Sequence, residues 1–260
     1  MKMGRSLPLV PLLCALLSGC SESIEQPLEQ TTEKIYAVDP SVNLSIRNRD
    51  GSIRIYGWGE PEIKVQAIKK AYSTDRLNKI VVDISVQPDS VSIETNFPPM
   101  PRWGLFDRSG TVDYTIIVPE TSKITRVELI NGEVSIDGIR GGSVDASLST
   151  GRLYAHNCFG NLRLTVNNGG LDLVYDWSEQ RSFSVDATIV RGNVRAFIPG
   201  DASFHLLAES LTGKVASDFT DQKQRNGQVP KIDTHIGANP GPDIKIRATE
   251  GNVKIVEVNP

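Results

Sequence analysis

Few side chains in this sequence could form a reactive centre. The 260 residues include only three histidines and three cysteines. His156 and Cys158 have a His-x-Cys spacing, and residues two apart in a strand point to the same side, so the pair could in principle bind a metal. Two ligands do not complete a zinc site. Both residues are therefore predicted to be structural, and neither a metal nor another cofactor is expected.

Two aspartates offer a second kind of chemistry. Asp145 and Asp186 stand in matching Ser-Val-Asp-Ala strings, which predicts that both face outward, two repeats and about 10 Å apart. Inverting glycosidases hold two carboxylates at a slightly shorter separation. Arg163 occupies the same position in the intervening repeat, so an alternating charge ladder is the simpler interpretation and a catalytic pair is the alternative. The Gly-x-Ser-x-Gly string of serine hydrolases does not occur.

A third candidate is a proline-rich segment with large apolar side chains. Three prolines between positions 98 and 101 precede Trp103, Leu105 and Phe106. These side chains could insert into a partner, a glycan or a bilayer surface. They could instead fold back as a cap over unpaired strand edges, and this second reading is the one we favour.

Composition narrows the classes of function. Lys and Arg number 28 against 31 Asp and Glu, a balance that argues against a nucleic-acid partner. Hydrophobic residues make up 39% of the chain, which is enough for a folded core.

The N-terminus has the features of a lipoprotein signal. Lys2 and Arg5 precede an apolar run, Leu7 to Leu17, that is too short to span a bilayer comfortably. The run ends in Leu-Ser-Gly-Cys, which resembles a bacterial lipobox and implies lipidation of Cys20. The alternative is an ordinary cleaved signal peptide. By the same resemblance, Ser21 after the cysteine favours the outer membrane if the cell has one.

These features divide the chain into three parts. Residues 1–19 are predicted to be the signal peptide, and 20–34, which are polar and rich in Glu, a flexible tether. Residues 35–258 are predicted to form one all-β domain, with an antiparallel insertion at about 60–118.

The all-β prediction rests on a glycine repeat. Each of seven glycines is followed two residues later by an aliphatic residue and preceded five residues earlier by an apolar one. The apolar residues thus stand at an odd distance before the glycine and at an even distance after it. Because the side chains of a strand alternate between its two faces, the chain must turn at the glycine. The glycines are Gly51, Gly132, Gly151, Gly169, Gly192, Gly213 and Gly251. Most intervals between them are close to 20 residues, a period typical of repeat proteins.

Two architectures fit this period. In a single-stranded β-solenoid each repeat is one coil, whereas in an antiparallel meander or sandwich each repeat is a hairpin. The second turn of the repeat, as in residues 137–142, is roomy for a tight hairpin. The solenoid is therefore favoured.

The order of the motifs resembles a known family. A first repeat, Asn48-Arg49-Asp50-Gly51-Ser52-Ile53, precedes a long antiparallel pair, the strand Val112 to Pro119 and serial Asn-Gly-x-Val-x-Ile repeats. Over about Ile35 to Val258 the chain resembles the bacterial putative-adhesin family, a domain of unknown function in envelope proteins. The resemblance implies a solenoid-like fold and supplies no catalytic residues.

The expected function follows from these features. We expect a lipid-anchored envelope protein, not an enzyme, that contacts an envelope protein or a cell-wall polymer through its solenoid faces or the 97–107 loop. The alternatives are a polysaccharide-active enzyme (a lyase or glycosidase) on a β-helix and an accessory of envelope-stress signalling.

Overall fold

The structure is a computed structural model that describes residues 26–99, 110–220 and 229–259. Strands dominate these residues, with one short helix. The N-terminal elements are β1 (Leu28–Ala37), β2 (Asn43–Trp58), β3 (Glu62–Ala71), α1 (Thr74–Lys79), β4 (Val81–Gln87), β5 (Ser90–Asn96) and β6 (Thr111–Pro119). The central strands are β7 (Lys123–Asp137), β8 (Arg140–His156), β9 (Phe159–Val174) and β10 (Ser184–Pro199). The C-terminal strands are β11 (Phe204–Ser210), β12 (Val215–Ser217), β13 (Lys231–Ile236), β14 (Asp243–Glu250) and β15 (Val253–Val258).

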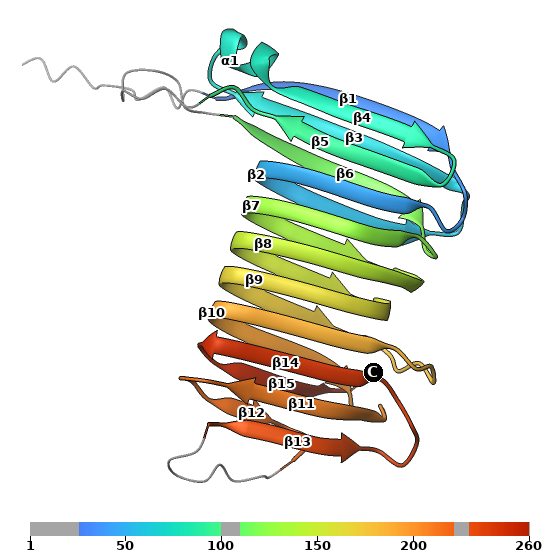
Figure 1. Cartoon of the computed structure of the whole chain (residues 1–260), viewed down its shortest axis with the longest axis vertical. Coiled ribbons are helices and arrows are strands. Elements are labelled where there is room, and N and C mark those ends of the chain that lie inside the picture. The colour runs from blue at the N-terminus through green and yellow to red at the C-terminus, as the bar shows by residue number, and fades with distance from the viewer. Residues whose placement is uncertain (1–25, 100–109, 221–228, 260) are drawn as a thin grey trace, which may run out of the picture.

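The long strands form a stack of parallel coils, as Figure 1 shows. β2, β7, β8, β9 and β10 pair in parallel along almost their whole length. Parallel pairing of consecutive repeats is the arrangement of a solenoid, since a meander of hairpins would pair them antiparallel. The β-solenoid prediction is therefore confirmed over the meander.

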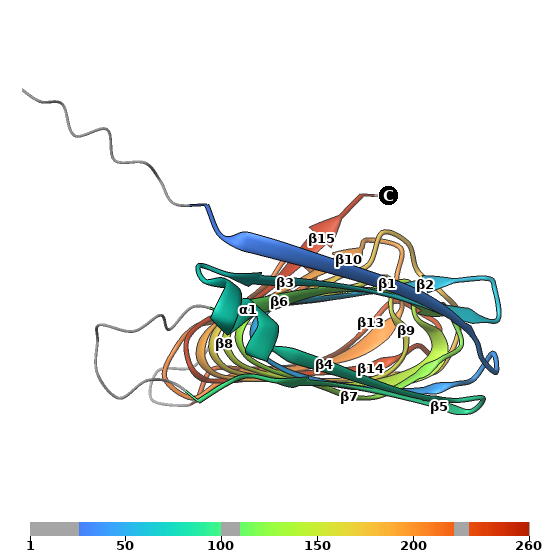
Figure 2. The same ribbon diagram turned by 90° about the horizontal axis from the view of Figure 1, so that it is seen from above.

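Each coil contributes to two layers that face each other (Figure 2). We call sheet A the layer formed by the halves of the long strands before their glycines, together with β4, β5, β11, β13 and β14. Sheet B is formed by the halves after the glycines, together with β1, β3, β6, β12 and β15. Inward side chains of both layers fill the core, for example Ala146, Leu153 and Leu164.

The repeat glycines form one column at the bend between the layers. Gly132, Gly151, Gly169 and Gly192 are register partners of the glycine in the coil before, and each has φ between 134° and 140°. A Cβ on Gly132 would lie 1.7 Å from the carbonyl oxygen of Gly51, so only glycine fits. Gly213 belongs to the same column but does not have a positive φ. The strand is interrupted there instead, between β11 and β12.

The edge opposite the glycines is closed by aromatic side chains where β9 connects to β10. Phe159 and Tyr175 are buried with ring centroids 5.2 Å apart, and Phe183 packs edge-on against Phe159 at 6.1 Å. Trp177 lies 5.4 Å from Phe159 but remains 42% exposed. These rings pack between the two layers and line a small cavity at the open edge.

The predicted insertion caps the first coil on both layers. β5 continues sheet A beside β2, and β4 pairs antiparallel with β5. β6 continues sheet B beside β2, followed by antiparallel β3. The antiparallel pairs of this insertion therefore lie on two different layers.

The tether prediction is wrong over residues 28–34, which lie in β1. This strand pairs antiparallel with β3 along ten residues and forms the outer edge of sheet B. Its side chains are exposed on both faces, with the exception of half-buried Tyr36, so the sequence shows no buried period. Backbone pairing with β3 orders the segment without burying its side chains, so the amino-acid composition gives no sign of a strand.

The C-terminal coil departs from chain order. β14 lies between β10 and β11, and β15 lies between β10 and β12. The last segment of the domain is therefore inserted into the stack, while the earlier β11 forms the next coil out and β13 pairs antiparallel at its edge. The interval of 38 residues before Gly251 contains this edge strand rather than a second coil.

Candidate functional site

The outer face of sheet A carries the predicted charge ladder. Arg163 is the register partner of both Asp145 and Asp186, on either side of it. Its guanidinium lies 3.6 Å from the Asp145 carboxylate, while Asp186 is contacted by Arg247 at 3.3 Å. The two aspartates thus lie on one face as expected, but each is engaged by a cation. The geometry is that of cross-strand ion pairing, and it does not form a pair of free carboxylates around a shared substrate.

A second ladder of ion pairs lies on the same face, two residues further along the strands. Arg47 contacts Glu128 at 3.0 Å and Glu94 at 3.3 Å, near the capped end of sheet A. At the other end, Arg247 contacts Glu209 at 2.9 Å. These pairs are largely exposed and contribute little stability each. They leave the outer face of sheet A polar and close to neutral, with a hollow over Asp145, Arg163 and Asp186.

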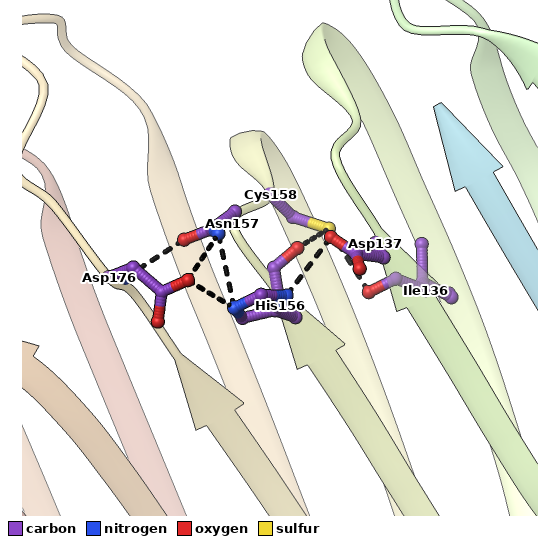
Figure 3. A network of polar contacts seen from close by, with 6 residues as sticks. All are labelled: Ile136, Asp137, His156, Asn157, Cys158 and Asp176. Atoms are coloured by element: carbon purple, nitrogen blue, oxygen red, sulfur yellow. Dashed lines mark hydrogen bonds and ion pairs between the residues drawn. The ribbon is translucent and has the colours of Figure 1, made fainter. Parts of the chain in front are cut away.

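The most connected polar site lies at the end of sheet B (Figure 3). His156 places Nδ1 3.1 Å from an oxygen of Asp137 and Nε2 2.8 Å from an oxygen of Asp176. Asn157 donates to Asp176 at 3.0 Å and accepts a hydrogen bond from its backbone N–H at 2.9 Å. Three successive coils are joined at this point, because the residues come from the ends of β7, β8 and β9.

The charge state of this site follows from its partners. Carboxylates only accept hydrogen bonds, so His156 donates to both Asp137 and Asp176 only when both of its ring nitrogens carry protons. Burial of the ring opposes its charged form, but the hydrogen bonds to Asp137 and Asp176 outweigh it, and the pKa of His156 is raised. The hydrogen bond from Asn157, with a smaller contribution from His156, lowers the pKa of Asp176.

These shifts make the site sensitive to pH. A raised pKa of His156 in the folded state stabilises the fold fully below the unfolded value of about 6.5. This contribution is lost as the pH rises through the folded pKa. The lowered pKa of Asp176 acts in the opposite direction, because its contribution is present above the unfolded value and is lost as the pH falls through the folded one.

We expect the Asp176→Asn substitution to lower the pKa of His156, because it removes one of the two charges that hold the imidazolium. An NMR titration of the His156 ring in both proteins measures the effect. Asp145→Asn, on the outer face of sheet A, is the matched control and should leave the titration unchanged. An unaltered His156 titration in Asp176→Asn would show that the carboxylate does not hold the proton.

His156 and Cys158 do not share a face, which corrects the predicted geometry. Asn157 between them takes a left-handed conformation with φ of 48°, and this turns Cys158 into the core. Burial raises the pKa of Cys158 to about 12. A buried, protonated thiol is a poor metal ligand and nucleophile. No group of three or more potential metal ligands occurs among residues 26–99, 110–220 and 229–259.

Several predicted residues lie outside the part of the chain that the structure describes. They are Cys20 with the whole signal peptide, and Trp103, Leu105 and Phe106.

Sequence reasoning missed the outer face of sheet B. Tyr56, His156 and Phe197 each stand five residues after a repeat glycine, and Arg54 and Arg195 stand three after. Asp172 shares that second position; it is only 6% exposed, and Arg195 holds it with two hydrogen bonds of 2.7 Å. The same glycine register that revealed the core would have aligned these side chains, had the outward positions been compared as well.

The chain is similar to solved structures from several bacteria. A putative cell adhesion protein from Clostridium sporogenes ATCC 15579 is 16% identical, with a TM-score of 0.46, and the match covers 88% of this chain and 100% of that one. A putative adhesin from Bacteroides fragilis NCTC 9343 is 11% identical, with a TM-score of 0.28 and coverages of 89% and 99%. A putative adhesin from Parabacteroides distasonis ATCC 8503 is 13% identical, with a TM-score of 0.24 and coverages of 87% and 97%.

The family comparison is more direct. The search of curated proteins found no match. The family model described as Toastrack DUF4097 matches residues 43–256, which include every repeat glycine and both capping pairs. The match begins with β2, the first coil, and ends within β15, the strand inserted into the stack. The chain therefore belongs to the Toastrack DUF4097 family.

Proposed function

We propose that this protein is a lipid-anchored, non-catalytic component of the bacterial cell envelope that binds an extended partner through the outer faces of its solenoid. The observation that supports this most is the register of the coils. Outward side chains repeat in straight columns along the stack, and the charges of the Asp145–Arg163–Asp186 column are paired with neighbours rather than gathered around a reacting point. Such a surface suits a long partner, either a protein or a cell-wall polymer.

The polysaccharide-cleaving alternative has no support in the side chains. Its candidate residues, Asp145 and Asp186, are separated by Arg163 and engaged in ion pairs. Each of these carboxylates is held beside a cation on an exposed face, which is not the paired-carboxylate arrangement of a glycosidase. The adhesin-like role therefore remains the better proposal.

The anchor would hold the domain close to the bilayer. β1 begins at Leu28, so the chain between a lipidated Cys20 and the domain could span at most about 28 Å. No helix among the described residues is long and apolar enough to cross a membrane. Membrane attachment would therefore depend on the acyl chains, each of which contributes about 0.8 kcal/mol per buried CH₂.

Fractionation of cells that express the full chain tests the anchor. We expect the wild-type protein in the membrane fraction and the Cys20→Ser protein almost wholly in the soluble fraction. Cys158→Ala is the matched control, because it also removes a cysteine but should leave the protein in the membrane. Wild-type protein that is soluble and lacks acyl chains by intact mass would contradict the anchor.

Photo-crosslinking in cells tests the binding role. A crosslinking residue at Thr165 or Ser135 would sample the outer faces of sheets A and B, and one at exposed Leu211 would sample the glycine bend. We expect one recurrent adduct from a face position and none from Leu211. Adducts that are identical at all three positions would indicate random collision and contradict a role for the faces.

A further inference from the structure

Three ring side chains form a straight column on the outer face of sheet B. Tyr56 is the register partner of Asp137, which pairs with His156; His156 pairs with Val174, and Val174 pairs with Phe197. Rings therefore occur on every second coil, at a repeat of about 10 Å because adjacent strands are 4.7–4.9 Å apart. Tyr56 is 37% exposed, and His156 and Phe197 are partly exposed.

The neighbouring column is basic. It runs through Arg54, Ser135, Tyr154, Asp172, Arg195 and Lys254. The one carboxylate in this column, Asp172, is buried and already bonded to Arg195. Among the described residues, neither Arg54 nor Lys254 has a carboxylate within salt-bridge distance. The nearby opposing charges are Glu133, in the column beyond, which faces Arg152, and Asp137, in the ring column itself. The strip beside the rings therefore carries a net positive charge.

A hollow lies at one end of the ring column. Val174, Phe197 and Val258 line it with apolar surface, and Asp176 supplies a hydrogen-bond acceptor at its rim. Arg195 lies 5.7 Å from the centroid of the Phe197 ring, so a basic group and an aromatic face meet there. Apolar surface beside a few placed polar groups is the usual composition of a ligand site.

Sheet A has a hollow of its own, over Asp145, Arg163 and Asp186, but its side chains differ from those of sheet B. On the same coils its outward column consists of Asp145, Arg163 and Asp186, with Ser147, Thr165 and Thr188 beside it. These side chains can form hydrogen bonds but provide no flat apolar face. The two outer faces of one solenoid thus differ in chemistry, and the rings single out sheet B.

We propose that the outer face of sheet B binds a linear β-1,4-linked glycan that carries acidic groups on alternate sugars, with the polymer lying along the solenoid axis. In such a glycan successive sugars are flipped, so the same sugar face recurs once per disaccharide. That recurrence matches a ring on every second coil. Apolar sugar faces stack on aromatic rings, and Arg54 and Lys254 are placed to form charge-assisted hydrogen bonds to the acidic groups. The assignment rests on the proposed function and names the polymer and the face.

Co-sedimentation of the detergent-solubilised full chain with insoluble glycans tests the proposal. Peptidoglycan sacculi supply an acidic β-1,4 polymer, chitin a neutral β-1,4 polymer and starch a neutral α-linked one. We expect the strongest binding to sacculi, weaker binding to chitin and none to starch. Equal binding to starch and sacculi would overturn the proposal.

Paired variants assign the effect to the rings. Phe197→Leu keeps the apolar volume but removes the ring, and we expect it to weaken binding to sacculi about tenfold, whereas Phe197→Tyr should retain binding. Tyr56→Leu should behave like Phe197→Leu. Leu211→Ala, an exposed apolar truncation at the bend, is the control and should bind normally. Circular dichroism checks that each variant is folded, and unaltered binding in both leucine variants would overturn the proposal.

Charge variants test the acidic groups. Arg54→Gln with Lys254→Gln should reduce binding to sacculi to the level of chitin and leave chitin binding unchanged. If the ring and charge variants bind normally but Arg163→Gln does not, sheet A is the binding face; the assignment to sheet B fails while the proposed function stands. If the wild-type protein binds no glycan and crosslinking yields no recurrent partner, the proposed function fails as well.

Discussion

A Gly151→Ala substitution should destabilise the domain by about 3 kcal/mol or more, enough to unfold a marginally stable protein. Gly151 has φ of 137°, a conformation that side chains rarely adopt. A Cβ at this position would lie 1.8 Å from the carbonyl oxygen of Gly132. The obstacle is backbone of the adjacent coil, and it cannot move without breaking the parallel ladder. Strain and steric overlap therefore add.

Urea denaturation followed by circular dichroism measures this change. Gly170→Ala is the matched control, because it lies on the next coil and its Cβ would meet only the flexible Arg152 side chain, at 3.8 Å. At that position alanine should be neutral or slightly stabilising, since it restricts the unfolded chain. Similar midpoints for Gly151→Ala and Gly170→Ala would mean that the bend tolerates a side chain and that the glycine column is not required.

The glycine column and the core could be predicted because they share one cause. Where a strand bends at a glycine, the inward side chains shift from odd to even distances from that glycine. The repeat is therefore visible in the sequence as apolar residues at constant offsets. Gly132 and Gly151 obey that rule and have the expected positive φ. Gly213 obeys the same offsets without positive φ, because the repeat records which face is inward and not the backbone angle at the turn.

Two features of the fold leave no such trace. β1 is stabilised by backbone pairing with β3, which any sequence can provide, and its exposed side chains show no period. β14 lies between β10 and β11, but β14 and β11 have apolar residues at the same offsets from their glycines. Ile246 and Ala208 both satisfy the same inward position, so the pattern cannot order their strands.

The candidate sites also include features that could be predicted from the repeat and features that could not. The ladder at Asp145 and Arg163 could be predicted because matching strings gave the residues one register. The partner of Asp186 could not, since Arg247 reaches it only because β14 is inserted beside β10. The left-handed turn at Asn157, which separates His156 from Cys158, has no sequence rule beyond the tolerance of asparagine for that conformation.

Deletion of residues 243–260 should disrupt far more of the domain than its length implies. In a solenoid built in chain order, loss of the last coil would leave the preceding coils intact, because each coil contacts only its neighbours. Here β14 and β15 pair β10 with β11 and β12. Their removal takes away buried side chains such as Ile246 and Ile255, whose burial with that of their neighbours is worth on the order of 10 kcal/mol.

Hydrogen exchange monitored by mass spectrometry distinguishes the two cases. In the truncated protein we expect β11 and β13 to lose protection although both remain in the chain, while β7, β8 and β9 stay protected. Excision of residues 28–37 is the control at the opposite end: it removes a whole strand, but β1 buries almost nothing, so β6 should remain protected and β3 should lose protection only at the amides that pair with β1. Retained protection of β11 after the C-terminal deletion would show that β11 can dock directly on β10. In that case β14 would not be needed to hold β11 in the stack. Its place between β10 and β11 argues instead that the C-terminal end of the stack forms only after the whole chain is available.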